Sequence, residues 1–264
     1  MRSMKSLFLF SESISPEVIP FPVMYVMPEW RIGWRNTASL QFFPGRGENC
    51  YSMFGRRIPC RGCPLPEKRP DVALRELGEN FFELHLFPYQ EGMLHLFKEI
   101  TIAFRDRLTG LLNESALLYH LNHQVKRVKR GFGTFSLVFL DIDKFKKIND
   151  IYGRHEGGDA ALKFVAASLK TFFRRDADVV ARKHGDEFIV VLPNVDHATA
   201  VASVNKFLKI FLVKNNFSFQ GGKIPLSLSA GVAECSPNCS SEQILALADE
   251  ALYISKARGR NCVT

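Results

Sequence analysis

The chain has 264 residues, enough for one large domain or two ordinary ones, and either arrangement can bury a core. Hydrophobic residues make up 46% and charged residues 23%, which is typical of globular proteins and excludes a disordered chain. The net charge of +8 favours acidic partners such as nucleotide phosphates. No DNA-binding spacing accompanies this charge, so we expect no nucleic-acid partner.

The apolar segments are short throughout the chain. The run at residues 136–140 falls far short of the ~20 residues that a membrane helix needs. The apolar patch at residues 7–10 is also too short for the hydrophobic region of a signal peptide. These features predict a cytoplasmic protein without a membrane span.

The first hundred residues contain short alternating segments with Pro and Gly between them. Alternation such as Phe82, Leu84 and Leu86 suits a sheet with one buried face. We expect a small antiparallel sheet with a loop-rich middle, with turns at 28–29 and 88–92. The predicted strands are residues 22–27, 31–36, 81–87 and 93–98.

Three of the six cysteines, Cys50, Cys60 and Cys63, cluster in this part. In a cytosolic chain the pattern argues against a disulfide framework. Cys-x2-Cys is a common half of a zinc site, which His85 or His95 would complete. A redox switch, and a packed turn whose thiols act as small apolar groups, are equally open interpretations.

Residues 21–101 resemble a PAS domain. The segment VMYVMPEWRIGWRNTASLQFF resembles the opening hairpin, and CYSMFGRRIPCRGCPLPE resembles a cysteine-bearing middle loop of some PAS domains. HLFKEIT resembles the last strand and its exit. The resemblance implies a sensor for an unknown ligand, preceded by an N-terminal extension at residues 1–20.

After Thr101 the chain alternates helical and strand patterns, which predicts an α/β domain. The apolar run 135–140 ends in Asp141-Ile142-Asp143, and Asp186-Glu187 precedes a second apolar run at 188–193. Each acidic pair alone is ambiguous, because turns and helix caps also favour Asp. Two carboxylate sites at strand ends of one domain together suit oxygen-ligated Mg²⁺ and a triphosphate.

Residues 102–264 resemble the GGDEF family of diguanylate cyclases. The entry motif DRLTGLLN is followed in family order by LDIDKFKKIND, GGDAAL, RKHGDEF, LSAGVA and ADEALYISKARGRN. The resemblance implies an α/β (α+β) fold with a palm-like or adenylyl-cyclase-like central sheet flanked by helices. It also implies condensation of two GTP into cyclic di-GMP by a homodimer in which each subunit holds one GTP.

The resemblance further implies a role for each matching residue. Mg²⁺ or Mn²⁺ would be held by Asp141, the Ile142 carbonyl and Asp186, with Glu187 as a further metal or catalytic carboxylate beside the catalytic Asp186. Substrate would be bound by Lys144, Phe145 and Lys146 (phosphate), Asn149 and Asp159 (guanine), and Lys256 and Arg260 (outer phosphates). The product cyclic di-GMP would inhibit at Arg175 and Asp178, with Lys206 as a second cation; a surface ion pair is the alternative for this match.

The sequence departs from the family pattern in two places. In RKHGDEF, the motif that gives the family its name, His184 replaces the first Gly. A side chain at this position predicts crowding of the nucleotide or backbone strain at a positive φ. The alternative is that His184 is a neutral turn residue. Residues 153–159 are one residue longer than usual, which either displaces Asp159 or is absorbed by two glycines. The alternative function is therefore a degenerate domain that binds GTP or cyclic di-GMP as a regulatory module. Only residues 102–105 link the two parts, and they show no coiled-coil heptad.

Overall fold

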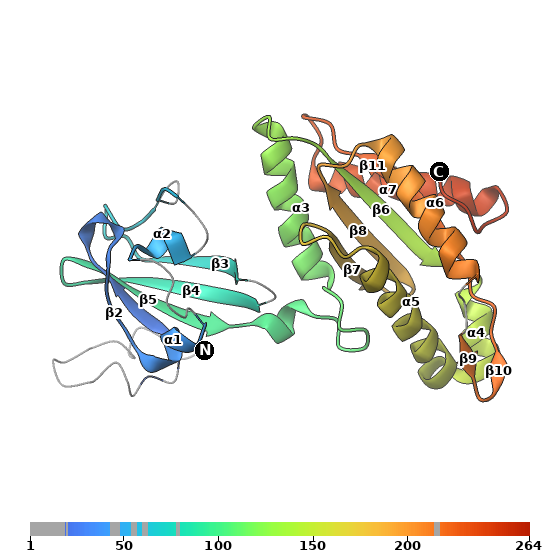
Figure 1. Cartoon of the computed structure of the whole chain (residues 1–264), viewed down its shortest axis with the longest axis horizontal. Helices are drawn as coiled ribbons and strands as arrows, with labels where there is room; N and C mark the ends of the chain where they lie inside the picture. Colours follow the sequence, from blue (N-terminus) through green and yellow to red (C-terminus); the bar gives the residue numbers. More distant parts are fainter. Residues whose placement is uncertain are drawn as a thin grey trace. The chain divides into compact units, whose positions relative to one another are not determined.

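The computed structural model describes residues 19, 21–42, 48–53, 57–59, 63–77, 80–213 and 217–264, without the side chains of 42, 76, 77, 154 and 155. The chain divides into two compact units, Met1–Ala103 and Phe104–Thr264 (Figure 1). None of the helices in the described residues combines the length and the apolar character needed to cross a bilayer.

The first unit is built on one five-stranded antiparallel sheet in the order β2-β1-β5-β4-β3. All four strands predicted from the sequence are present, and β3 is an additional strand that the pattern did not indicate. The strands are β1 (Val23–Val26), β2 (Ile32–Arg35), β3 (Asp71–Leu77), β4 (Asn80–Tyr89) and β5 (Gly92–Glu99). The connections contain η3 (Pro28–Trp30), α1 (Thr37–Phe42) and α2 (Cys50–Met53), and η4 (Thr101–Phe104) follows β5.

The connector expected at residues 88–92 is shorter than predicted. β4 continues through Pro88, which lies opposite Met93, so that only Gln90 and Glu91 form the turn. Proline has no N–H to give to a ladder and is normally confined to sheet edges. It is accommodated here because the pairing of β4 with β3 already ends at Leu86.

The second unit contains a four-stranded antiparallel sheet in the order β11-β6-β8-β7 (Figure 1). Its strands are β6 (Phe135–Ile142), β7 (Val179–His184), β8 (Glu187–Pro193) and β11 (Leu228–Glu234), with a separate small hairpin of β9 (Ser218–Phe219) and β10 (Gly222–Lys223). The helices are α3 (Glu114–Lys129), α4 (Phe145–Tyr152), α5 (Asp159–Phe172), α6 (His197–Val213) and α7 (Ser241–Ala257).

Helices cover both faces of this sheet, which explains why β6 is buried along its whole length. On one face Leu137 and Phe139 pack with residues of α3 and α7. On the other face Val138 and Leu140 pack with residues of α4, α5 and α6. Because successive side chains of a strand alternate between faces, Asp141 emerges on the α3 and α7 face. The mixed α and β architecture agrees with the predicted fold class.

Candidate functional site

The two acidic stretches of the second unit meet at one end of the sheet. In the antiparallel register of β6 and β8, Asp141 lies directly opposite Glu187. Residues opposite each other in such a ladder project to the same face with Cβ atoms ~5 Å apart. Asp186 precedes Glu187 in the β7–β8 turn, so three carboxylates from two separate segments gather at this point.

A lysine from α7 also reaches this cluster. Lys256 Nζ lies 2.8 Å from Asp141 Oδ2, the shortest ion pair recorded in the described residues. α7 is brought this close because it packs directly on β11 at Gly231, where a β-carbon would lie 2.1 Å from the Leu252 amide nitrogen. The glycine of the LSAGVA segment therefore positions the lysine at the end of the next helix.

Burial and neighbouring charge both act on Asp141. Burial is the largest cause and, together with the nearby Asp186 and Glu187 carboxylates, it raises the pKa of Asp141 to about 6, against the opposing effect of Lys256. A carboxylate cluster with this much desolvation and mutual repulsion is a site that a cation stabilises.

Glu187 is held by two basic side chains of β7. Lys183 Nζ lies 3.4 Å and His184 Nε2 3.2 Å from Glu187 Oε2. The strain expected at His184 is absent, because this residue ends β7 with a φ that is not positive, and Gly185 takes the positive φ of 53° instead. His184 is thus the last residue of β7 and not the turn residue that the sequence left as the alternative.

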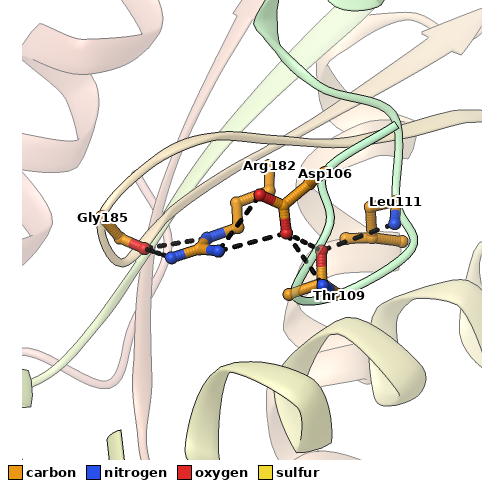
Figure 2. Close-up of polar contacts among 5 residues, drawn as sticks. All are labelled: Asp106, Thr109, Leu111, Arg182 and Gly185. Atoms are coloured by element: carbon orange, nitrogen blue, oxygen red, sulfur yellow. Dashed lines mark hydrogen bonds and ion pairs between the residues drawn. The ribbon is translucent and has the colours of Figure 1, made fainter. Parts of the chain in front are cut away.

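Arg182 of the RKHGDEF motif contacts Asp106 of the entry motif DRLTGLLN (Figure 2). Arg182 Nη1 donates to both carboxylate oxygens of Asp106, at 3.1 and 3.2 Å, while its Nε and Nη2 donate to the Gly185 carbonyl at 3.0 and 2.7 Å. Thr109 Oγ1 donates to Asp106 Oδ1 at 2.6 Å. Burial alone would raise the pKa of Asp106, but the hydrogen bonds from Thr109 and Arg182 outweigh it and lower that pKa.

This link was not predicted, because Asp106 and Arg182 are separated by 76 residues. A local pattern carries no signal for such a pair. The sequence offered one hint of this role: Arg182 lies three residues before Gly185, and its guanidinium can donate to the carbonyl of the turn.

The predicted guanine-reading residues flank a π-helical segment, η5 (Gly153–Gly158). Single-turn π segments accommodate one additional residue within a helix. The extra residue noted in the sequence is thus absorbed between α4 and α5, and Asp159 begins α5. Asn149 Oδ1 is buried without a hydrogen-bond donor, beside Gly158, where a β-carbon would lie 2.0 Å from it. This oxygen is positioned for a donor that the described residues do not supply.

The predicted phosphate-binding residues surround the start of α4. Lys144 precedes the helix in a left-handed conformation, with φ 57°, and Lys144 and Arg260 line one cavity of about 430 Å³. The Phe145 amide belongs to the first turn of α4, whose N–H groups lack intrahelical acceptors, and Lys146 is exposed. Among the described residues, and unlike the acidic cluster, these groups form no hydrogen bond or ion pair with one another.

The predicted inhibitory residues lie at the opposite end of β7 from the acidic cluster. Arg175 and Asp178 contact each other, with Nη1 to Oδ1 at 3.7 Å, and the Arg175 amide donates to Asp178 Oδ2 at 3.2 Å. Arg175 remains about half exposed, and burial raises the pKa of Asp178. Lys206 lies exposed on α6.

In the first unit, Cys50, Cys63 and His95 line a small cavity of about 30 Å³. Cys63 Sγ accepts a hydrogen bond from Trp30 Nε1 at 3.3 Å, and Cys60 lies outside the described residues. His85 does not line this cavity and instead contacts Glu83. Across the described residues, the acidic cluster of the second unit included, no three His, Cys, Asp or Glu side chains are already arranged to hold a metal ion.

Comparison with known proteins assigns the second unit. The family model described as "Diguanylate cyclase, GGDEF domain" matches residues 103–262. The chain belongs to the GGDEF family. The GGDEF domain therefore carries the acidic cluster, the Arg182 link and the predicted nucleotide residues.

Relatives and solved structures agree with this assignment. The chain is 38% identical over 170 residues to diguanylate cyclase DgcP of Pseudomonas aeruginosa, covering 63% of this chain and 24% of that protein. It is 33% identical over 218 residues to diguanylate cyclase DgcS of Shewanella oneidensis, covering 78% of this chain and 69% of that protein. The coiled coil and GGDEF domain of DgcB from Caulobacter crescentus, solved with c-di-GMP, superposes with a TM-score of 0.58 at 28% identity, covering 62% of this chain and 85% of that one.

Proposed function

We propose that this chain is a sensor-regulated diguanylate cyclase that condenses two GTP into cyclic di-GMP and releases two pyrophosphates. The observation that carries the proposal is the meeting of Asp141, Asp186 and Glu187 at one end of the β6–β8 ladder, next to Lys256. The family assignment and the diguanylate cyclase relatives support it. The chain spans only a quarter of DgcP, so the activity of the whole protein belongs to the proposal.

Mg²⁺, or Mn²⁺ in its place, fits the acidic cluster by the chemistry of its donors. Asp141, the Ile142 carbonyl, Asp186 and Glu187 offer oxygen atoms, which hard divalent cations prefer. The burial and repulsion that raise the pKa of Asp141 are relieved by a bound cation. When bound, the metal would supply charge neutralisation for the triphosphate.

The residues of the chain position GTP for attack by the 3′-hydroxyl of one molecule on the α-phosphorus of the other. Asp159 would accept from the N1–H and 2-amino group of guanine, a pattern that adenine lacks. Asn149 Oδ1, buried without a donor, would accept a further guanine hydrogen. Lys256 and Arg260, with the amides at the start of α4, would balance phosphate charge. Each subunit would hold one GTP, so the active species would be a homodimer.

We further propose that residues 21–101 form a PAS-like sensor behind a 1–20 extension, and that the cyclase domain spans 102–264. The antiparallel sheet of the first unit and its small thiol-lined and imidazole-lined cavity support a sensing role. The alignment with DgcS is longer than the second unit, Phe104–Thr264, so it also includes part of the first unit. A metal or redox centre at Cys50, Cys60 and Cys63 stays a hypothesis, which metal analysis and thiol titration of the purified protein would check.

The decisive experiment is incubation of the purified full chain with GTP and Mg²⁺, with the products separated by chromatography and the mass of the protein measured in parallel by light scattering. We expect cyclic di-GMP and two pyrophosphates per product from a dimeric sample. A dimer that binds GTP but forms no product would support the regulatory-module alternative, for which the contacts of Lys183 and His184 to Glu187 are the structural reason. Absence of both binding and product would contradict both functions.

A further inference from the structure

Asp143, the second acid of the Asp-x-Asp sequence, has a different environment from Asp141. It is buried, and its carboxylate accepts hydrogen bonds from two side chains and one backbone amide of the protein. Ser229 Oγ donates to Oδ1 at 2.6 Å, and Ser227 Oγ donates to Oδ2 at 2.7 Å. The amide of Asn261 donates to Oδ2 at 3.1 Å. These three donors take up most of the acceptor capacity of the carboxylate, which distinguishes Asp143 from the carboxylates of the acidic cluster.

These contacts join three segments that are distant in the sequence. Asp143 follows β6 directly, the two serines come from β11 and the residue before it, and Asn261 belongs to the turn after α7. The amide of Asp143 also donates to the Ser227 carbonyl at 2.9 Å, and the amide of Asn261 donates to Ser229 Oγ at 3.1 Å. A single carboxylate therefore fixes the end of β6, the start of β11 and the turn that carries Arg260.

The turn itself needs such an anchor. Gly259, Arg260 and Asn261 have φ values of 108°, 70° and 51°, a run of left-handed conformations that is costly for the two residues with side chains. Beyond the turn, the Cys262 carbonyl accepts from the Ala230 amide at 2.9 Å, which pins the following residues to β11. Between this attachment and α7, the Arg260 amide donates to the Ser255 carbonyl at 3.2 Å, and the Asn261 amide, shared between Asp143 and Ser229, ties the turn to the β6 and β11 strands.

The position of the turn decides where a phosphate-binding cation lies. Arg260, Asn261 and Asp143 line the same 430 Å³ cavity as Lys144 and Lys147. Lys256, one helical turn earlier, is already held by Asp141 at 2.8 Å and needs no further support. Within the described residues, the Arg260 side chain forms no ion pair, so its placement depends on its backbone.

We propose that Asp143 is a positioning residue for the triphosphate: it clamps the 259–261 turn so that Arg260 meets the outer phosphates of GTP. The inference rests on the proposed function. Asp143 contacts neither nucleotide nor metal in this role. The serines match it chemically, because an ionised carboxylate only accepts and each serine hydroxyl supplies a donor. An amide at this position would direct an N–H₂ group at these donors and disrupt the clamp.

The test compares nucleotides with and without the outer phosphates. Wild type, Asp143→Asn, Arg260→Ala and the double variant are titrated calorimetrically with a non-reactive GTP analogue and with GMP. We expect Asp143→Asn to weaken binding of the analogue roughly tenfold and that of GMP less than twofold, since one charge-assisted contact is lost. The double variant should bind no more weakly than Arg260→Ala, because both changes remove the same contact. KM for GTP should rise more than kcat falls.

Several outcomes would overturn the role of Asp143: unchanged affinity for the analogue, equal losses for both nucleotides, or full additivity with Arg260→Ala. The control Asp249→Asn makes the same chemical change at an exposed position of α7 and should alter neither affinity. If Asp143→Asn does not fold, Ser229→Ala removes one donor to the same carboxylate and should give a smaller effect of the same kind. Failure of the wild type to bind either nucleotide contradicts the proposed function instead.

Discussion

At the scale of single residues, the carboxylates of the site differ in which groups balance their negative charge. Asp141 has a lysine at 2.8 Å, and Glu187 has Lys183 and His184 at 3.4 and 3.2 Å. Asp143 is compensated by neutral donors alone. Asp141, Asp143 and Glu187 thus lie in three different chemical environments, although nothing in the sequence distinguishes their carboxylates.

Replacing Glu187 by Gln should abolish turnover without unfolding the domain. The amide keeps the shape of the side chain but loses the charge and the basicity, so we expect kcat to fall by roughly 10²–10⁴-fold, the range for a positioned acid–base group. Product formation and far-UV circular dichroism measure the two effects. Glu250→Gln, an exposed exchange on α7, is the control. Retained turnover in Glu187→Gln would remove this residue from the mechanism.

His95 should make the first unit sensitive to acid. Burial, reinforced by the nearby Arg75, lowers the pKa of His95 to about 3 from an ordinary 6.5. Below pH 6.5 the unfolded chain therefore binds a proton at His95 that the folded unit does not bind. The contribution of His95 to the free energy of unfolding is fully present above pH 6.5 and is lost as the pH falls toward 3. Between pH 7.5 and pH 5 this residue alone should cost about 2 kcal/mol.

The variant His95→Leu should lose that part of the pH dependence. Urea unfolding at the two pH values measures it, and tryptophan fluorescence reports the first unit selectively, because both tryptophans, Trp30 and Trp34, belong to it. His197→Leu, at an exposed position of the second unit, should behave as wild type. Identical pH dependence of His95→Leu and wild type would show that His95 does not carry the effect.

At the scale of elements, the packing of α7 on β11 positions the basic end of the site. Gly231 permits this packing, since a β-carbon there would lie 2.2 Å from the Ala248 carbonyl oxygen and 2.1 Å from the Leu252 amide nitrogen. Both contacts are with backbone atoms, which cannot rotate away. The helix as a whole would have to shift, and Lys256 would shift with it.

Gly231→Ala should therefore destabilise the GGDEF domain by roughly 1–3 kcal/mol, the usual cost of overpacking, and also weaken GTP binding. Urea unfolding followed by circular dichroism at 222 nm gives the change in free energy of unfolding. Gly222→Ala is the matched control, because its β-carbon would meet only the Phe219 carbonyl oxygen at 3.6 Å, and its effect should stay within about 0.5 kcal/mol. Equal stability of the two variants would contradict this account of the packing.

At the scale of the whole molecule, the proposed product site is remote from the acidic cluster. Arg175 and Asp178 precede β7, whereas the catalytic turn follows it, and a six-residue strand spans about 17 Å. Product bound at the proposed site would not displace substrate directly. Under the proposed function, inhibition from this position would act on the arrangement of domains or subunits that brings two GTP molecules together.

Arg175→Ala should relieve inhibition by cyclic di-GMP while leaving the initial rate unchanged, because a bidentate donor to phosphate or guanine is lost far from the reacting groups. Initial rates measured against added cyclic di-GMP give the inhibition constant, which should rise at least tenfold. Arg174→Ala is the control at the adjacent exposed position. Unchanged inhibition would show that the Arg175–Asp178 contact is a surface ion pair with no role in product binding.

Local sequence determined the regular elements of both units with few errors. The two apolar runs expected to be strands that end in acidic pairs lie in β6 (Phe135–Ile142) and β8 (Glu187–Pro193), and the four strands predicted in the first unit are all present. The errors concern residues whose conformation depends on distant partners. Pro88 stays in β4 because the pairing of β4 with β3 extends only to Leu86. The extra residue of 153–159, for which the sequence left two alternatives open, lies in a π-helical turn.

By itself the sequence determined that the second unit is a GGDEF domain and which acids and bases its motifs contain, because each motif is a continuous segment. Only the tertiary structure decided what those residues contact. Asp106 and Arg182 are 76 residues apart, and Asp143 reaches a serine 84 and an amide 118 residues away. Strand register and helix packing create such pairs, and the pattern of either partner alone carries no information about the other.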